Sequence, residues 1–136
     1  MDIDTMQAGR ELNLLIAEKI FGWHWEEVDD ISKCYVPSDK KMLCPPGKNW
    51  DSLGWHVPLY STDITAAFEV VEKLKQQEIW LTMEYARQPE SKGMVWTAHF
   101  RGRIRKNKNR FYAVYGIDDN PATAICRAAY KAVTAP

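Results

Sequence analysis

The sequence predicts a single α+β domain in which three amphipathic helices pack on an antiparallel sheet of three to four or more strands. Three observations support this fold class. Apolar side chains recur at helical spacing in three segments, they alternate with period 2 in three runs between the second and third of those segments, and the length of 136 residues is usual for one domain.

The first helix is expected to begin near Asp4 or Thr5, because Asp4 and Gln7 have the spacing of a capping box. Gly22 follows the last periodic residue, where a left-handed C-cap favours glycine. The apolar face of this helix comprises Ala8, Leu12, Leu15, Ile16 and Ile20.

Residues 23–59 give the weakest pattern of the chain, with four prolines and two glycines. Residues 30–36 form one candidate strand, and the remainder has the composition of turns and loops. A connection of this length in a compact domain is often functional.

The second helix is the most clearly marked element. Ser61, Thr62 and Asp63 are typical N-cap residues, and Pro58 keeps the preceding chain extended. The apolar face is expected to comprise Ile64, Ala67, Phe68, Val71 and Leu74.

Three runs after this helix alternate with period 2 and predict strands with one buried and one wetter face. The alternating sets are Ile79, Leu81, Met83 and Tyr85, then Met94, Trp96, Ala98 and Phe100, then Phe111, Ala113, Tyr115 and Ile117. Residues 89–93 and 105–109 are expected to be turns, and such short connections favour an antiparallel meander.

The third helix is expected to begin at Asn120 and Pro121, an N-cap followed by proline at the first helical position. Its apolar face comprises Ala122, Ile125, Cys126, Ala129 and Val133.

Three blocks of sequence carry a family resemblance. They are AGREL with AEK at 8–12 and 17–19, YSTDITAAFEVVEKL at 60–74, and AICRAA at 124–129. They resemble, in this order, the opening helix, the central signature and the closing helix of the phage ABA sandwich domain family. The resemblance implies a tailed-phage or prophage origin and a helix–sheet–helix sandwich. It implies no reaction and supplies no catalytic residues.

Charge limits the class of partner. Lys and Arg together number 18, as do Asp and Glu, so the formal net charge is zero. A protein that coats extended nucleic acid would be basic overall, so we expect no such partner. Near-zero net charge also weakens the repulsion between copies, and we expect a homo-oligomer.

The sequence predicts a cytoplasmic protein, in the host cell if it is encoded by a phage. The first four residues are acidic and unlike a signal peptide, and no apolar run approaches the roughly 18 residues of a membrane span. We therefore expect no membrane partner, and the three cysteines are expected to be free thiols.

The sharpest candidate site is basic. Arg101, Arg103 and Arg105 alternate along one predicted strand, so their side chains should project from one face, together with that of His99. Residues 99–110 contain six Lys or Arg and no acid. Arginine forks suit phosphate and carboxylate groups. The pattern predicts either an anion-binding surface or a solvated strand face that ends in a basic turn.

Aromatic residues extend this hypothesis. If the strand register places Tyr112 on the arginine face, its ring could stack on a base whose phosphate the arginines hold. Trp55 joins the candidate ligand-binding residues, because four of the six tryptophans lie in the first 55 residues, outside the clearest periodic segments. Large aromatic side chains either anchor a core or line a binding surface.

The start of the second helix is a second candidate site, comprising Tyr60, Ser61, Thr62 and Asp63. A helix N-terminus offers free N–H groups and positive potential to an anion. Ser61, Thr62 and Asp63 can instead satisfy those donors themselves as caps.

Metal and catalytic signatures are weak. Zinc-type ligands occur at His24, Cys34, Cys44 and His56, but spacings of 10, 10 and 12 lack the close pair typical of zinc sites. We expect no metal and no cofactor. G-x-S-x-G, H-E-x-x-H and Walker motifs are absent, so we expect no catalytic residue and no enzyme.

These observations predict a phage-type binding protein. Its ligand would be small and anionic, for example a cyclic nucleotide that serves as a host immune signal and that the protein sequesters. The alternative is a protein–protein interaction module or inhibitor, whose contact surface comprises exposed tryptophans of residues 23–55. A third hypothesis is an enzyme acting on a nucleotide through a His or Asp base that the sequence does not identify.

Overall fold

The computed structural model describes residues 2–27, 41–48, 56–87 and 93–135. Within these ranges the chain forms the helices α1 (Arg10–Phe21), α2 (Ile64–Lys75) and α3 (Pro121–Val133). Strands β1 (His24–Glu27) and β2 (Lys41–Cys44) form an antiparallel pair, and β3 (Trp80–Arg87), β4 (Met94–Ile104) and β5 (Asn107–Asp118) form an antiparallel meander. The predicted α+β fold class is confirmed.

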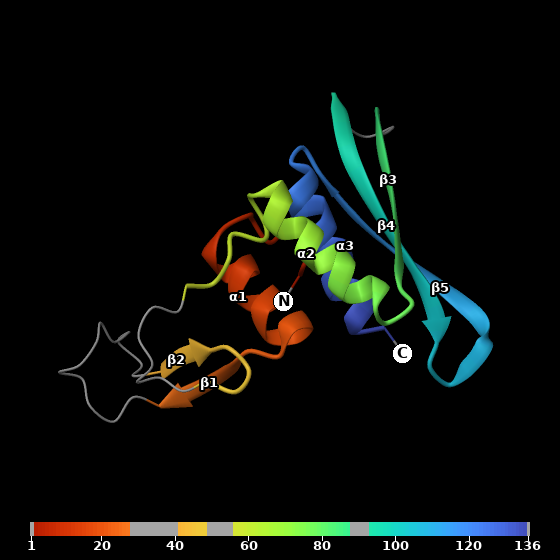
Figure 1. Cartoon of the computed structure of the whole chain (residues 1–136). Helices are drawn as coiled ribbons and strands as arrows, with labels where there is room; N and C mark the ends of the chain where they lie inside the picture. The colour runs from red at the N-terminus through yellow and green to blue at the C-terminus, as the bar shows by residue number, and fades with distance from the viewer. Residues whose placement is uncertain (1, 28–40, 49–55, 88–92, 136) are drawn as a thin grey trace.

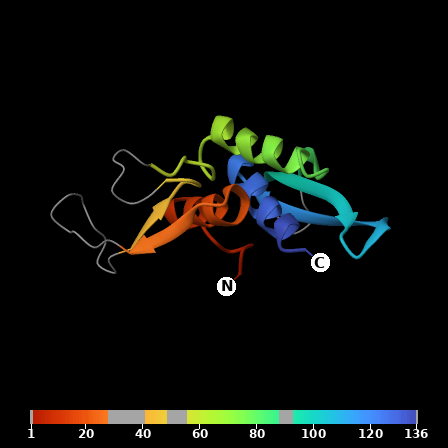
Figure 2. The same ribbon diagram turned by 60° about the horizontal axis from the view of Figure 1, so that its bottom comes forward.

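Helix α3 lies at the centre of the molecule, between the three-stranded sheet and the other two helices (Figure 1). It contacts β4 and β5 on one side and α1 and α2 on the others. The β1–β2 pair lies beside α1, away from the three-stranded sheet (Figure 2). The buried residues of α3 are Ala122, Thr123, Ala124, Ile125, Cys126, Arg127, Ala128, Ala129 and Ala132.

Helix α3 approaches β5 so closely that only glycine fits at position 116. A Cβ atom there would lie 2.2 Å from the carbonyl oxygen of Ala124 and 2.6 Å from the backbone nitrogen of Ala128. Backbone atoms cannot rotate away as a side chain can, so a larger residue would force the helix off the sheet. The alanine-rich surface of α3 and Gly116 together set this spacing.

A buried hydrogen-bond cluster joins the N-terminal segment to the start of α2 and to α3. The hydroxyl of Ser61 accepts from the backbone N–H of Gly9 at 2.9 Å and donates to Oδ1 of Asn13 at 2.6 Å. The hydroxyl of Thr123 donates to the carbonyl oxygen of Ser61 at 2.7 Å. Because these side chains are buried, their hydrogen bonds remove the cost of burying unsatisfied polar groups.

Arg127 is the one charged residue of α3 that is buried, at 7% exposure. Its guanidinium donates to the carbonyl oxygens of Met6 at 2.8 Å and Ile117 at 2.6 Å, and it forms an ion pair with Asp118 at 3.1 Å. This side chain therefore ties the N-terminal segment and the end of β5 to the central helix.

Two details of the predicted helices are wrong. Helix α1 begins at Arg10 instead of near Asp4 or Thr5, and its N-cap is Gly9, whose N–H is satisfied by Ser61. In α2, Ile64 and Phe68 are 39% and 51% exposed. Ala67 and Leu74 are buried as predicted, and the other buried residues are Ala66 and Val70, so the face that packs on α3 is rotated from the predicted one. The caps at Gly22, Asp63 and Asn120 are confirmed.

The three predicted strands are confirmed, and two short ones were missed. β1 and β2 fall in the segment whose pattern was weakest, and the candidate strand at 30–36 lies outside the described residues. The predicted turn at 105–109 is shorter than expected, because β5 begins at Asn107 and leaves Arg105 and Lys106 as the turn.

The connection from α2 to β3 places a non-glycine residue in the left-handed region. Glu78 has φ 60°, and the N–H groups of Glu78 and Ile79 donate to the carbonyl oxygens of Lys75 and Leu74. This is the hydrogen-bond pattern of a Schellman motif, in which the left-handed position is usually glycine.

Replacing Gly116 with alanine is expected to lower the free energy of unfolding by roughly 3 kcal/mol, since the added methyl overlaps the backbone of α3. Chemical denaturation followed by circular dichroism measures this. Gly93→Ala is the matched control, because a methyl there meets nothing within 4 Å and should change stability by less than about 0.5 kcal/mol. Equal effects of the two substitutions would contradict the close contact.

Replacing Glu78 with glycine is expected to raise the free energy of unfolding by about 0.5–1 kcal/mol, because glycine adopts the left-handed conformation without the steric cost of a Cβ. Gln77, the residue before it, has no positive φ, so Gln77→Gly should lower stability by a similar amount. The same denaturation experiment checks both, and the expected result is two effects of opposite sign.

Candidate functional site

One face of the three-stranded sheet packs on the helices, and no described element packs on the other (Figure 1). The register places Arg101 opposite Trp80 of β3 and Ala113 of β5, and Arg103 opposite Phe111. The open face is the name used below for this uncovered surface. Its exposed or half-buried residues are Trp80, Thr82 and Glu84 of β3, His99, Arg101 and Arg103 of β4, and Phe111, Ala113, Tyr115 and Ile117 of β5. Val95 and Thr97 of β4 share this face but are only 8% and 5% exposed.

Large apolar side chains lie exposed on the open face. Trp80, Phe111, Tyr115 and Ile117 are each between 43% and 47% exposed. Strand β5 thus directs Phe111, Tyr115 and Ile117 to solvent, while Tyr112, Val114 and Gly116 point to the helices. A contiguous apolar surface on a soluble domain usually marks a site of interaction.

Two arginines lie over one aromatic ring at the end of this surface nearest the β4–β5 turn. The guanidinium carbons of Arg101 and Arg103 are 4.8 Å and 5.2 Å from the centre of the Phe111 ring. Arg103 also donates to the carbonyl oxygen of Lys108 at 3.0 Å. Within the part of the chain that the structure describes, neither guanidinium forms an ion pair, so most of their donors remain available to an anion.

His99 extends the open face away from the arginines. Its ring meets that of Tyr115 edge to face, with the ring centres 4.5 Å apart. Both residues are at least partly exposed. His99, Arg101 and Arg103 of β4 therefore lie between Trp80 of β3 and the two aromatic residues Phe111 and Tyr115 of β5.

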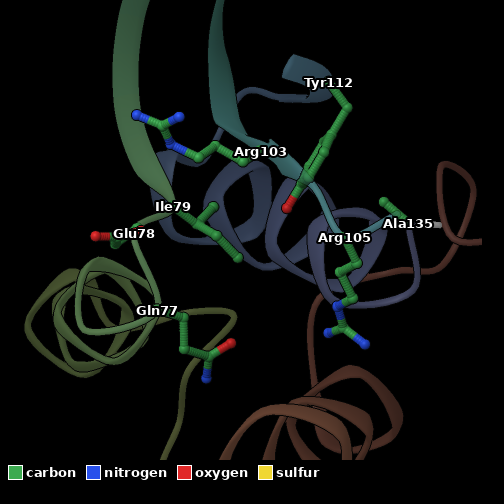
Figure 3. A pocket seen from close by; sticks show the side chains of 7 residues that line it. All are labelled: Gln77, Glu78, Ile79, Arg103, Arg105, Tyr112 and Ala135. Carbon is green, nitrogen blue, oxygen red and sulfur yellow. The ribbon is translucent and has the colours of Figure 1, made fainter. Parts of the chain in front are cut away.

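A pocket of about 150 Å³ lies at the edge of this surface, where the β4–β5 turn approaches the α2–β3 connection. Figure 3 shows Arg103 and Arg105 on different sides of the pocket, with the Tyr112 ring between them. The hydroxyl of Tyr112 donates to the carbonyl oxygen of Ala132 at 3.2 Å. Burial raises the pKa of Tyr112, and the charge of Arg105 offsets part of that effect.

The structure brings together some of the predicted basic site and separates the rest. His99, Arg101 and Arg103 share one face, as predicted. Arg105 does not lie on the strand, because β4 ends at Ile104 after an irregularity at Arg103 and Ile104. Tyr112 does not share the arginine face, because it pairs with Gly102 and points to the helices, where its ring would block any Cβ at Gly102.

The aromatic residues that do lie beside the arginines are Trp80 and Phe111, with Tyr115 beside His99, and the sequence reasoning missed all three. Period-2 alternation put Phe111 and Tyr115 in one set, but only the pairing of Arg103 with Phe111 shows that this set shares the arginine face. Trp55 lies outside the described residues.

Two of the four residues of the second candidate site, at the start of α2, are buried. Tyr60 and Ser61 are 3% and 0% exposed, and the Tyr60 ring stacks on Phe21 with the ring centres 4.9 Å apart. Asp63 accepts from the N–H of Thr65 and so caps the helix. The structure thus shows the capping role of this segment and keeps it apart from the arginines of β4.

Comparison with known families tests the resemblance seen in the sequence. Residues 14–130 match the family model of the phage ABA sandwich domain. The chain belongs to this family. Searches of curated proteins and of solved structures find no match.

The match to the phage ABA sandwich domain begins inside α1 and ends inside α3, so it spans the three helices and both sheets. The open face falls within it, as do Ser61 and Thr123 of the buried cluster, whereas Gly9 and Asn13 of that cluster precede it. Among the described residues of this domain, no helix has the length and apolar character needed to cross a bilayer.

Tyr60 makes the stability of this phage ABA sandwich domain sensitive to alkaline pH. Burial, together with Glu69 and Cys126, raises its pKa from 10.0 to about 12. The folded state therefore holds the phenolic proton more tightly than the unfolded state. The stabilisation that protonated Tyr60 gives to the folded state is complete below pH 10 and is lost as the pH rises towards 12.

Tyr60→Phe, which cannot ionise, is expected to move the midpoint of alkaline unfolding to higher pH, as measured by circular dichroism. Tyr85→Phe is the matched control, because Tyr85 is 53% exposed. An unchanged midpoint for Tyr60→Phe, or an equal shift for the control, would contradict the buried environment of Tyr60.

Proposed function

We propose that the open face binds a small anionic ligand that carries a planar ring, with nucleotides as the ligand class, and that the protein binds this ligand without transforming it. One observation carries the proposal. Arg101 and Arg103 lie over Phe111 without an ion pair in the described chain, among exposed aromatic side chains.

The arginines supply the anion-binding half of the site. Both guanidinium groups lie within about 5 Å of one ring centre, so two like charges are held near each other. A phosphate group between them relieves this repulsion and accepts hydrogen bonds from both forks. Stacking on Phe111 limits the rotamers of the two long side chains, which lowers the entropy cost of binding.

Exposed rings supply the base-binding half of the site. Trp80 of β3 lies opposite Arg101. Tyr115 of β5 lies opposite His99, which precedes Arg101 by two residues on β4. Stacking of a base on such a ring contributes about 1–3 kcal/mol and tolerates every base. An aromatic and basic sheet face is thus suited to a nucleotide that lies flat on it.

The pocket beside the face is too small to enclose such a ligand. Its volume of about 150 Å³ lies below the roughly 300–1,000 Å³ typical of small-molecule sites. It has room for a phosphate group near Arg103 and Arg105, while the ring of the ligand stays on the sheet. Arg105 and Tyr112 do not lie on the arginine face, and they contribute to binding by lining the pocket that holds this phosphate group.

Family membership supports a phage context for this activity. In the cytoplasm of an infected host, a protein that holds a nucleotide without consuming it would sequester a signal, for example a cyclic nucleotide of host immunity. Two copies that close over the ligand would retain it longer, and the expected homo-oligomer fits this role.

The second candidate function is a protein–protein contact, and the same exposed rings favour it. Trp80, Phe111, Tyr115 and Ile117 resemble the aromatic centre of an interface, with the arginines as polar anchors. Trp25, from the segment first expected to form such a surface, is 43% exposed. The two functions differ in whether a free nucleotide binds.

Combined Arg101→Ala and Arg103→Ala substitutions are expected to weaken nucleotide binding by about 10-fold or more, because hydrogen bonds from charged donors contribute about 1.5–3 kcal/mol each. Isothermal titration with a panel of mononucleotides and cyclic dinucleotides measures this, and affinity should fall as salt rises. The matched control is Arg87→Ala, an exposed arginine of β3 that lies outside the open face.

A panel in which no nucleotide binds or raises the melting temperature would overturn the nucleotide proposal and favour the protein–protein contact. Binding that survives the double substitution would place the site elsewhere. Chemical turnover of a bound nucleotide would show an enzyme.

A further inference from the structure

Three different metal-binding side chains meet on the β1–β2 pair, far from the open face in Figure 1. His24 of β1 lies directly opposite Cys44 of β2, and Glu26 follows two residues after His24 on the same side of its strand. The Nε2 atom of His24 is 2.5 Å from Oε2 of Glu26. One ligand atom from each of the three residues lies within 4.8 Å of the other two.

This donor set fits zinc better than the other common metals. An imidazole nitrogen, a carboxylate oxygen and a thiolate sulfur are all zinc ligands, at bond lengths of about 2.0–2.3 Å. Magnesium and calcium prefer oxygen ligands alone. Ligand atoms of one tetrahedral zinc lie about 3.5 Å apart. His24 and Glu26 would therefore move apart by about 1 Å, and ligand atoms at the 4.8 Å limit would approach by about as much.

We propose that His24, Glu26 and Cys44 bind a zinc ion and leave its fourth position open to water or to another ligand. The backbone pairing of β1 with β2 holds the three side chains on one side of the hairpin before the metal arrives. His24 is exposed and Cys44 is buried, so the ion has a path from solvent to a partly shielded site.

Without metal, His24 and Glu26 are joined by a hydrogen bond, and the Cys44 thiol donates to the carbonyl oxygen of Met42 at 3.8 Å. Burial and the Glu26 carboxylate raise the pKa of the Cys44 thiol, which therefore keeps its proton at neutral pH. Zinc binding replaces that S–H bond with a Zn–S bond and releases the proton to solvent.

A bound zinc would also stabilise the hairpin itself. β1 and β2 are only four residues each, and a pair of such strands is marginally stable alone. A metal that joins one strand to the other at the His24 and Cys44 positions holds their register. The sequence showed His24 and Cys44 as zinc-type ligands, but their separation of 20 residues lacks the close pair of a zinc motif, and we expected no metal. Glu26 was missed because it lies in an acidic run beside Glu27.

The test is a titration of the chelator-treated full chain with Co²⁺, followed by competition with Zn²⁺. The expected result is one equivalent of Co²⁺, with visible bands of a four-coordinate site and a sulfur-to-cobalt charge-transfer band that Zn²⁺ removes. In weak buffer, Zn²⁺ should release a proton. Mg²⁺ should produce none of these signals.

Cys44→Ser should abolish the charge-transfer band, and His24→Ala and Glu26→Gln should each weaken Co²⁺ binding by at least about 10-fold. His99→Ala is the matched histidine control and should bind as the unmodified protein does. His24→Ala is expected to fold because His24 is exposed. The test therefore remains valid even if Cys44→Ser, a substitution at a buried position, fails to fold.

Absence of binding in the unmodified protein would overturn the proposal. Wild-type affinity in the His24→Ala or Glu26→Gln variant would also overturn it, because the metal would then use other ligands. Nucleotide binding is measured separately at the open face, so failure of the zinc site and failure of the proposed function are distinguishable.

Discussion

The contact between the backbones of α3 and β5 at Gly116 is the constraint on which the rest of the structure depends. With the helix lying directly on the strand, α3 is buried by the sheet on one side and by α1 and α2 on the others. A helix in this position cannot carry large or charged side chains unless each has a partner. Its alanines supply small side chains where the helix meets its neighbours. The buried polar groups of Thr123 and Arg127 are satisfied by hydrogen bonds.

The central position of α3 also explains why one sheet face remains open. The helices occupy a single side of the three-stranded meander, so its other side needs polar residues or a partner. The chain places both kinds of side chain there, arginines on β4 and large apolar residues on β3 and β5. Guanidinium groups over Phe111 cover part of the apolar surface without withdrawing their charge from solvent. Such a surface keeps the guanidinium donors exposed, which is what the proposed binding requires.

The two proposed sites lie on separate sheets and use different chemistry. Cations and aromatic rings on the three-stranded sheet favour an anion, whereas histidine, glutamate and cysteine on the two-stranded sheet favour a cation. Both depend on cross-strand pairing, because neither set of residues is contiguous in the sequence. Strand register is therefore the structural feature that produces both sites.

The sequence by itself determined the fold class, the three long strands, the three helices with most of their caps, the family, and the shared face of His99, Arg101 and Arg103. The family follows from the resemblance of three blocks of sequence, and the other features follow from local periodicity and cap chemistry, which involve residues close together in the chain. Only the tertiary structure decided the start of α1, the buried face of α2, the burial of Tyr60 and Ser61, and the side of the sheet on which Tyr112 lies. Each depends on contacts between distant segments, and neither helical spacing nor strand alternation contains the register or rotation that sets those contacts.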